Sequence, residues 1–358
     1  MKRVVVAMSG GVDSSVTAYL LKEAGYDVSG VTMNLLELSC RIENPDTCCS
    51  LQTFADVRDV ADKLGIKHHI IDCKVEFEQE VVKYFVNEYL MGRTPNPCVV
   101  CNSKIKFGLL RDKVKELGAD YLATGHYARI SKYNGRYIIK KAIDQTKDQS
   151  YFLYRLYQKQ LSQTIMPLGE YQKADVRKIA AKLCLKIADK PESQEICFIP
   201  DGDYRRFIQQ KAKESLQPGE IRNKVGDILG KHQGIALFTI GQRKGLGISA
   251  GKPLYVVAID QKRNAIIVGQ EIDLYNRTLI ANELNWIAIE KLTSEMEVMT
   301  KIRYLHLPGK PAGAKSIINS LDNGKVRVEF DQPQRAITPG QSVVFYKDDV
   351  VIGGGIIE

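Results

Sequence analysis

The sequence lacks an apolar run that approaches the ~20 residues of a membrane-spanning helix. Its first residues, Met1-Lys2-Arg3, lead directly into a strand-like run and show no pattern of a cleavable signal peptide. No internal repeat or low-complexity tract is present. We therefore expect a soluble cytoplasmic protein without a membrane partner. An apolar content of 44% over 358 residues supplies a sizeable core and predicts two to three domains.

A basic tail is also absent, although the net charge is +9. Residues 201–358 carry 22 Lys and Arg against 18 Asp and Glu, and the preceding residues carry 29 against 24. The positive surplus is thus spread over both parts of the chain. A broad positive surface suits a large polyanion such as folded RNA, although a basic enzyme without such a partner has the same composition.

Strand and helix patterns alternate over the first 125 residues. Strands are predicted from β-branched content at 3–8, 27–33, 68–73 and 121–125. Helices are predicted at 13–24, from a cap at Ser50 to Leu64, at 76–90 and at 104–117. This alternation predicts an α/β fold with a doubly wound parallel sheet, in which ligands bind at the carboxyl ends of the strands.

The pattern changes beyond residue 126. Alternation around Asn134-Gly135 predicts a hairpin over 127–142, and helical patterns return at 171–185 and 203–213. Residues 218–271 are rich in glycine, and from 278 to 358 short strands alternate with turns, which indicates a small β-barrel or sandwich. We predict a catalytic domain at 1–200, a small central domain at 201–275 and a C-terminal β-barrel at 276–358.

The stretch AMSGGVDSS, residues 7–15, lies where the first strand gives way to the first helix. Gly10 and Gly11 let backbone N–H groups approach an anion, and the helix N-terminus adds partial positive charge. A Walker loop, G-x-x-x-x-G-K-[ST], would place a lysine near the β- and γ-phosphates, and this stretch lacks that lysine. The pattern predicts a phosphate site of another kind; the alternative is a simple glycine turn.

Eight cysteines in a chain without a signal pattern favour thiol chemistry or metal binding over a disulfide framework. Cys98 and Cys101 lie in TPNPCVVCNSKIKFG, which we interpret as a proline-stiffened loop where Lys104, Lys106 and a nearby helix start favour the thiolate. Cys197 lies in a second loop, ESQEICFIPDGDY.

Three interpretations of these cysteines remain open: reactive thiols, structural zinc, or a [4Fe–4S] cluster. Zinc would use the C-x-x-C pair with Cys48 and Cys49, and the cluster would use Cys98, Cys101 and Cys197. Cys73 and Cys184 sit in apolar patterns and are expected to be buried and inert.

The loop SGGVDS matches the SGGxDS signature of the PP-loop ATP pyrophosphatases. Six segments also occur in the order found in the tRNA-specific 2-thiouridylases: AMSGGVDSS, TPNPCVVCNSKIKFG, ATGHYAR, KDQSYFLY, SQEICFIP and FTIGQRKGLGI. They span residues 7 to 248, and the C-terminal part is similar to that family's β-barrel. The resemblance implies that ATP adenylates the O2 of the wobble uridine of a tRNA, after which sulfur replaces that oxygen.

The resemblance also implies roles for individual residues. Cys101 would be the nucleophile and Cys197 the persulfide carrier, with a transient disulfide between them, and Asp13 would assist with Mg²⁺ or substrate orientation. The residues implied to bind ATP are Ala7, Met8, Ser9, Gly10, Gly11, Val12, Asp13, Ser14, Met33 and Gly125. Those implied to face the target base are Asn96, Pro97 and Cys98, although some members of the family carry aspartate at the position of Cys98. Those implied to contact tRNA are His126, Lys147, Asp148, Gln149, Arg303, Tyr304 and Gln341.

The implied cofactors are ATP and Mg²⁺, and the implied partners are tRNA and a persulfide donor, either a sulfur-relay protein or a cysteine desulfurase. Other classes of function remain as alternatives. Another PP-loop adenylating ligase would not need two placed cysteines, and a glutamine-dependent amidotransferase would need a glutaminase domain that the sequence does not show. A non-catalytic tRNA-binding module would not need an intact SGGVDS.

Overall fold

The computed structural model describes residues 1–36, 51–188, 195–249, 251–304 and 313–358. The predicted helix cap Ser50, and also Cys40, Cys48 and Cys49, lie outside the described residues. The chain forms two compact units. The first contains residues 1–81, 98–202 and 349–351, and the second contains residues 82–97, 203–348 and 352–358.

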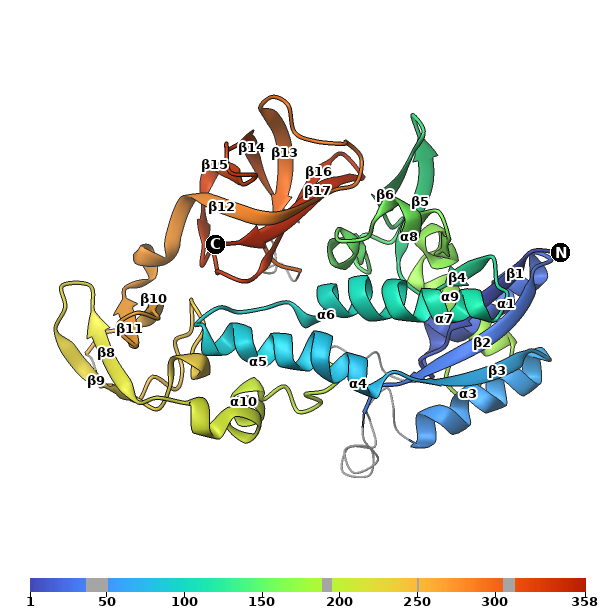
Figure 1. Cartoon of the computed structure of the whole chain (residues 1–358), viewed down its shortest axis with the longest axis horizontal. Helices are drawn as coiled ribbons and strands as arrows, with labels where there is room; N and C mark the ends of the chain where they lie inside the picture. Colours follow the sequence, from blue (N-terminus) through green and yellow to red (C-terminus); the bar gives the residue numbers. More distant parts are fainter. Residues whose placement is uncertain (37–50, 189–194, 250, 305–312) are drawn as a thin grey trace. The chain divides into compact units, whose positions relative to one another are not determined.

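A five-stranded parallel sheet with the order β3-β2-β1-β4-β7 forms the centre of the first unit (Figure 1). The predicted parallel sheet is therefore confirmed. The sequence pattern missed its last strand, because a strand of two residues is too short to show a period. The strands are β1 (Arg3–Ala7), β2 (Asp27–Asn34), β3 (Lys67–Asp72), β4 (Tyr121–Ala123) and β7 (Thr164–Ile165).

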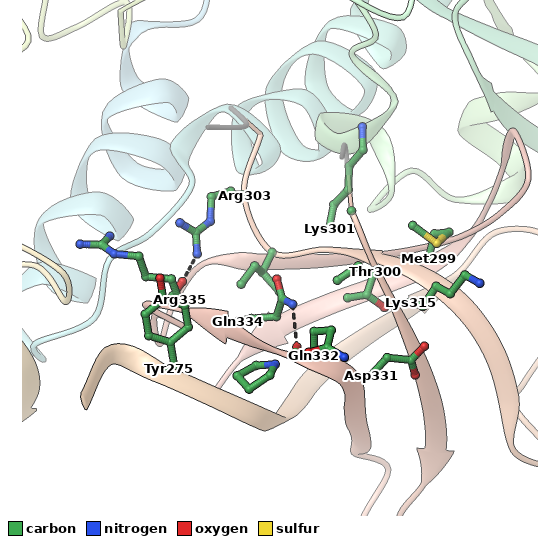
Figure 2. Close-up of a pocket in the computed structure, with 14 residues that line it drawn as sticks. Tyr275, Met299, Thr300, Lys301, Arg303, Lys315, Asp331, Gln332, Gln334 and Arg335 are labelled. Carbon is green, nitrogen blue, oxygen red and sulfur yellow. Dashed lines mark hydrogen bonds between the residues drawn. The ribbon is translucent and has the colours of Figure 1, made fainter. Parts of the chain in front are cut away.

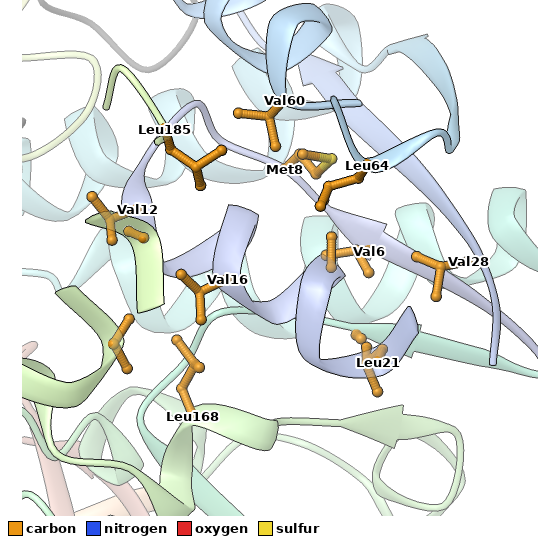
Figure 3. Packing of buried hydrophobic residues seen from close by; sticks show 14 of the residues in the cluster. Val6, Met8, Val12, Val16, Leu21, Val28, Val60, Leu64, Leu168 and Leu185 are labelled. Atoms are coloured by element: carbon orange, nitrogen blue, oxygen red, sulfur yellow. The ribbon is translucent and has the colours of Figure 1, made fainter. Parts of the chain in front are cut away.

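Three helices share one apolar cluster with one face of this sheet. Helix α1 (Val12–Glu23) packs beside α3 (Leu51–Leu64) and α9 (Lys173–Lys182). Figure 3 shows the apolar cluster they share with the sheet, in which Met8 lies near Val60 and Leu64 of α3. The buried Val5 lies outside that cluster on the opposite face, since side chains alternate along a strand.

Two long helical segments follow β3. The first runs through α4 (Lys74–Phe77), a π-helical turn η1 (Glu78–Val82) and α5 (Lys83–Leu90). The second runs through α6 (Pro97–Val100), a π-helical stretch η2 (Cys101–Leu110) and α7 (Arg111–Glu116). The predicted helix start at 104 is therefore wrong by seven residues. Pro97 is the first helical residue, a position where its fixed φ and missing N–H are tolerated.

A hairpin of β5 (Ala128–Tyr133) and β6 (Arg136–Lys141) confirms the predicted turn. Asn134 and Gly135 have φ of 47° and 79°, as a two-residue type I′ turn requires. The rest of the first unit is built from short elements: η3 (Ser150–Leu153), α8 (Gln158–Leu161) and η4 (Pro167–Glu170).

The second unit contains a four-stranded sheet and a barrel. The sheet has the order β10-β11-β8-β9, with β8 (Gly219–Asn223), β9 (Ile228–His232), β10 (Tyr255–Asp260) and β11 (Ala265–Gly269). Short helices accompany it: α10 (Tyr204–Ala212), η5 (Lys213–Ser215), η6 (Ile235–Leu237) and η7 (Glu271–Leu274).

The barrel has the strand order β12-β15-β14-β13-β16-β17 and closes through pairing of β12 with β17, which decides between the predicted barrel and sandwich. Its strands are β12 (Tyr275–Trp286), β13 (Met296–Lys301), β14 (Ala314–Ser320), β15 (Val326–Arg335), β16 (Ser342–Lys347) and β17 (Val350–Ile357). Within the described part of the chain, no helix is long and apolar enough to cross a bilayer.

Candidate nucleotide and thiol site

The turn between β1 and α1 is closely packed at two glycines. Gly10 has a φ of +72°, and a Cβ there would lie 2.6 Å from Thr53 Cγ2. Gly125, which follows β4, lies against the turn from the neighbouring strand end. A Cβ on Gly125 would lie 2.9 Å from both the Asp13 carbonyl carbon and the Ser14 nitrogen. The turn therefore sits at the carboxyl edge of the parallel sheet, between the ends of β1 and β4.

The serine hydroxyls of this turn hold its shape. Ser14 Oγ accepts a hydrogen bond from the Ser9 N–H at 3.2 Å and donates to the Gly11 carbonyl at 3.1 Å. Ser15 Oγ donates to the same carbonyl at 3.1 Å. No side chain of the described residues caps the start of α1, so its first N–H groups are available to bind an anion.

Asp13 belongs to an ion pair that the sequence patterns did not reveal. Lys173 Nζ donates to Asp13 Oδ1 at 2.7 Å and to Oδ2 at 2.8 Å. The Tyr127 hydroxyl donates to Asp13 Oδ1 at 2.8 Å. Lys173 is only 8% exposed, and its ammonium also lies 5.5 Å from the centre of the Tyr127 ring. The turn between β1 and α1, which we call the phosphate turn after its predicted role, thus has a buried cation beside it.

A second carboxylate fixes the backbone of Lys173. The Lys173 N–H, in the first turn of α9, donates a hydrogen bond to Asp144 Oδ2 at 3.0 Å. Burial acts to raise the pKa of Asp144, but hydrogen bonds from Thr146 and from the Lys173 N–H outweigh it, so the pKa is lowered. Asp144 therefore stays ionised and anchors the start of α9 beside α1. Nothing local in the sequence distinguishes Lys173 from the other lysines of that helix.

The donor set around Asp13 does not fit a magnesium ion in this arrangement. Both carboxylate oxygens of Asp13 accept hydrogen bonds from Lys173. Mg²⁺ could bind Asp13 only after the Lys173 ammonium had moved away from one of these oxygens. The described residues also contain no group of three or more His, Cys, Asp or Glu side chains able to hold a metal. Cys98, Cys101 and Cys197 are all described and are not gathered into such a group, and the iron–sulfur cluster stays an untested alternative.

The C-x-x-C pair lies in a helix and not in the predicted loop. Cys98 is in α6, and Cys101, which is 7% exposed, is the first residue of the π-helical stretch η2. The expectation of a favoured thiolate is wrong for Cys98. Its side chain reaches solvent, but crowding by protein atoms raises the pKa of the thiol, and the opposing effect of Lys106 is smaller.

The π-helical stretch that begins at Cys101 is stabilised from another helix. The side-chain amide of Gln160, which is 6% exposed, donates to the Ser103 carbonyl at 3.0 Å and to the Phe107 carbonyl at 2.8 Å. The carbonyls of the widened helix thus gain partners outside it. Wide helical turns of this kind are frequent at functional sites. Their positions depend on such tertiary contacts, which explains why the sequence did not reveal this one.

Cys197 is partly buried in a turn of the first unit. The next residue, Phe198, packs its ring against Phe77 with centroids 5.8 Å apart. Helix α4, which contains Phe77, also packs against η2, so the segments that carry Cys197 and Cys101 share a neighbour. No disulfide joins these two described cysteines, and the transient disulfide between them stays a prediction.

The two cysteines expected to be inert differ from each other. Cys73 is fully buried, as predicted. Cys184 is exposed, so the prediction of burial is wrong there. It follows the end of α9 with a φ of +51°, a left-handed position that turns the chain and its side chain out of the helix. The apolar pattern around it belongs to neighbouring residues.

His126 follows Gly125 and lies beside η2. Its Nδ1 and Thr124 Oγ1 are 2.8 Å apart, and its ring centre is 5.7 Å from that of Phe107. Burial lowers the pKa of His126 well below 6.5, and the nearby Lys106 lowers it further. His126 is therefore neutral, and any contact it makes with tRNA is a hydrogen bond or stacking contact and not a charge pair.

Because His126 is neutral in the folded chain, we expect the stability of the fold to decrease at acidic pH. Because the unfolded chain binds a proton at His126 below about pH 6.5 and the folded chain does not, stability falls as the pH drops below that value. His126→Gln is expected to reduce the slope of the free energy of unfolding against pH by up to about 1.4 kcal/mol per pH unit. Thermal unfolding from pH 7.5 to 5 measures this, with the exposed His69→Gln as control. Equal slopes for wild type and His126→Gln would contradict it.

Asp148 and Gln149 make hydrogen bonds within the protein. The family resemblance implied that both residues contact tRNA. The buried Asp148 carboxylate accepts from the Ala142 N–H at 3.2 Å and from Ser150 Oγ at 2.9 Å. Gln149 Oε1 accepts from the Tyr127 N–H at 2.9 Å. The Gln149 bond holds the backbone at Tyr127, which follows Gly125 and His126. The contact of Asp148 and Gln149 with tRNA stays a prediction, as does that of Lys147.

In the second unit, residues next to the barrel strands hold the segment before Asn96 and Pro97, which are predicted to face the target base. Gln341 Nε2 donates to the Thr94 carbonyl at 2.9 Å and to the Pro95 carbonyl at 3.2 Å. The Thr94 N–H donates to the Pro339 carbonyl at 2.8 Å. Gln341 therefore positions the backbone that leads to Asn96 and Pro97.

A basic cleft of about 610 Å³ lies on the barrel (Figure 2). Four cationic side chains and one carboxylate are among its lining residues: Lys301, Arg303, Lys315, Arg335 and Asp331. Arg303 Nη2 donates to the Arg335 carbonyl and to the Ala336 carbonyl. Arg303 thus has a structural role at the cleft, and its contact with tRNA, like that of Tyr304, stays a prediction.

The glycine–serine turn after β1, the uncapped start of α1 and the strand end at Gly125 meet at the carboxyl edge of a parallel sheet, an arrangement suited to binding an anion. Together with the SGGVDS sequence, they define an ATP-utilising enzyme of the PP-loop class.

Comparisons with known proteins identify the family. Models described as a tRNA methyl transferase HUP domain, a tRNA methyl transferase PRC-barrel domain and an aminomethyltransferase beta-barrel domain match residues 2–201, 205–270 and 276–357. The chain is 52% identical to a tRNA-specific 2-thiouridylase MnmA 1 of Clostridium botulinum (strain Loch Maree / Type A3), over 100% of this chain and 99% of that protein. It is 53% identical to a tRNA-specific 2-thiouridylase MnmA 2 of Thermoanaerobacter sp. (strain X514), over 99% and 98%. The chain therefore belongs to the tRNA-specific 2-thiouridylase family.

The solved structure of a 4-thiouridine synthetase–RNA complex with bound ATP is a more remote match. It shares 18% identity with this chain at a TM-score of 0.36, covering 60% of this chain and 51% of that one.

Proposed function

We propose that the chain converts uridine at the wobble position of tRNA to 2-thiouridine, with ATP and a persulfide as the other substrates. Its similarity to 2-thiouridylases over its whole length carries this proposal. The phosphate turn and both reactive cysteines supply the chemistry, and all of them lie in the first unit.

The first step is adenylation. The uridine O2 attacks the α-phosphorus of ATP, the α–β bond breaks, and pyrophosphate leaves into the turn at residues 9–15. The N–H groups at the start of α1 bind its negative charge. The base then carries AMP on its O2, which is a far better leaving group than a carbonyl oxygen. This activation lets a sulfur nucleophile attack C2.

The second step transfers sulfur from a persulfide on Cys197. In one route the terminal sulfur attacks C2 and AMP leaves, and Cys101 then attacks Sγ of Cys197 and releases the thiocarbonyl. In the other, Cys101 attacks first and releases hydrosulfide, which displaces AMP. Both routes leave a Cys101–Cys197 disulfide, which an external dithiol reduces by two electrons. A persulfide suits this step because its terminal sulfur ionises easily and its S–S bond is weak.

Binding of tRNA is proposed to extend over several basic surfaces. The barrel cleft lined by Lys301 and Lys315 is one candidate. A second cleft of about 260 Å³ in the glycine-rich segment is lined by Arg243 and Lys252. Arg205 lies close to that segment, since a Cβ on Gly245 would be 2.8 Å from its Nη1. Contacts to phosphate from such residues give most of the affinity and make it sensitive to salt.

The decisive experiment incubates the protein with unmodified tRNA, ATP and a persulfide donor. We expect 2-thiouridine in the nucleosides measured by mass spectrometry, with one AMP and one pyrophosphate per sulfur transferred. A tRNA with cytidine at the wobble position is the matched control and is expected to give no 2-thiouridine, AMP or pyrophosphate. Formation of ADP and orthophosphate, or thiolation without ATP, would overturn the proposal.

A further inference from the structure

The phosphate turn lacks a lysine in its sequence, yet a lysine lies beside it in the fold. Lys173 comes from α9, 160 residues after Asp13, and its ammonium is within 2.8 Å of both Asp13 oxygens. Asp13 is in the first turn of α1, where the N–H groups bind an anion. The buried ammonium is therefore next to the place where phosphate binds.

The position of Lys173 is fixed from several sides. Asp144 holds its backbone N–H, the Asp13 carboxylate holds its ammonium, and the Tyr127 ring covers the ammonium at 5.5 Å. The Tyr127 hydroxyl in turn holds Asp13. A lysine placed in this way has given up most of its side-chain freedom before any ligand binds, which reduces the entropy cost of a contact.

The charge of ATP calls for such a group. A helix N-terminus supplies only about half a positive charge, whereas the triphosphate carries several negative charges. We propose that Lys173 is a phosphate-contacting residue of the ATP site, whose ammonium exchanges an Asp13 oxygen for an oxygen of the phosphate chain. Asp13 and Tyr127 act as positioning residues that hold the ammonium at the turn.

The proposal uses only the ATP binding assumed in the proposed function, so its test contains neither tRNA nor a sulfur donor. Binding of α,β-methylene-ATP and of adenosine is measured by calorimetry for wild type and for Lys173→Met. We expect the affinity for α,β-methylene-ATP to fall at least about thirtyfold, while adenosine affinity changes less than about threefold. A merely structural lysine would weaken both ligands together, and that result would overturn the proposal.

A second comparison separates contact from neutralisation. If Lys173 only cancels the charge of Asp13, then Lys173→Met combined with Asp13→Asn binds α,β-methylene-ATP as well as Asp13→Asn alone. If Lys173 contacts phosphate, the double variant binds at least about tenfold more weakly than Asp13→Asn. Equal affinities of these two proteins would overturn the proposal.

The double variant also guards against misfolding. Lys173→Met alone leaves the Asp13 carboxylate without its cation, whereas removing both charges from a buried pair is close to neutral for stability. Lys173→Arg keeps the charge and is expected to retain more α,β-methylene-ATP affinity than Lys173→Met. Circular dichroism and a thermal melt verify that each protein is folded. Failure of this test with normal thiolation by the wild type leaves the proposed function intact.

Discussion

A Cys197→Ser protein is expected to form no measurable 2-thiouridine while it still releases pyrophosphate from ATP in the presence of tRNA. Serine cannot carry a persulfide, but the adenylation step uses the turn at Gly10 and Gly11 and needs no thiol. The same separation is expected for Cys101→Ser. Single-turnover thiolation should fall by at least about a thousandfold, the usual effect of removing a covalent nucleophile. Nucleoside mass spectrometry and a pyrophosphate assay measure the two steps separately.

Two other thiols serve as matched controls. Cys98→Ser is expected to keep most activity, because crowding raises the pKa of that thiol and the persulfide scheme assigns it no step. Cys184→Ser, at an exposed position, is expected to be unchanged. Loss of activity in Cys98→Ser, Cys101→Ser and Cys197→Ser alike, together with iron and sulfide in anaerobically purified protein, would favour a cluster. Normal thiolation by Cys101→Ser or Cys197→Ser would remove the persulfide scheme.

Gly10→Ala is expected to weaken ATP binding strongly and therefore to reduce thiolation. A Cβ would lie 2.6 Å from Thr53 Cγ2, and the φ of +72° is unfavourable for an L-residue by about 1–2 kcal/mol. The turn must move, and its N–H groups then lose their convergence on the phosphate. We expect ATP affinity to fall at least about a hundredfold, as several charge-assisted hydrogen bonds are lost. Calorimetric titration with α,β-methylene-ATP measures this.

Gly135→Ala is the matched control for Gly10→Ala. Gly135 has a φ of +79° at the tip of the β5–β6 hairpin, but a Cβ there would meet nothing within 4 Å. Alanine at this position has the same unfavourable backbone energy of about 1–2 kcal/mol, but its Cβ collides with no other atom. We expect a lower melting temperature and normal ATP affinity. If Gly10→Ala binds ATP as well as Gly135→Ala does, the turn is not the phosphate site.

Local patterns predicted those parts of the fold that depend on neighbouring residues. The β-branched run before SGGVDS gave a buried strand, and Asn134-Gly135 gave a type I′ hairpin, since each signal is contained in a few residues. The helix that begins at Pro97 was placed too late. Two prolines and a C-x-x-C pattern favour a loop unless the proline at the first helical position is recognised.

The most informative side chains of the site could not be found from the sequence. Lys173 reaches Asp13 only because the two-residue strand β7 returns the chain to the sheet and brings α9 beside α1. Gln160 satisfies carbonyls of η2 from 57 and 53 residues away. Such contacts are set by topology, and a single sequence carries no periodic signal for them. The motif predicted an anion site, and only the fold shows that Lys173 lies beside Asp13 of that motif.

The hold of Gln341 on the Thr94–Pro95 backbone has a practical consequence for trimming or tagging the protein. The Gly340 N–H donates to the Ile357 carbonyl at 2.8 Å, and the Ile357 N–H donates to the Gln341 carbonyl at 2.9 Å. Deleting β17 would remove these two hydrogen bonds. Gln341 would then no longer be held in place, and the Thr94–Pro95 backbone before Asn96 would lose its support. An affinity tag at that end should therefore be separated by a flexible spacer, and shortened versions should be judged by turnover as well as by solubility.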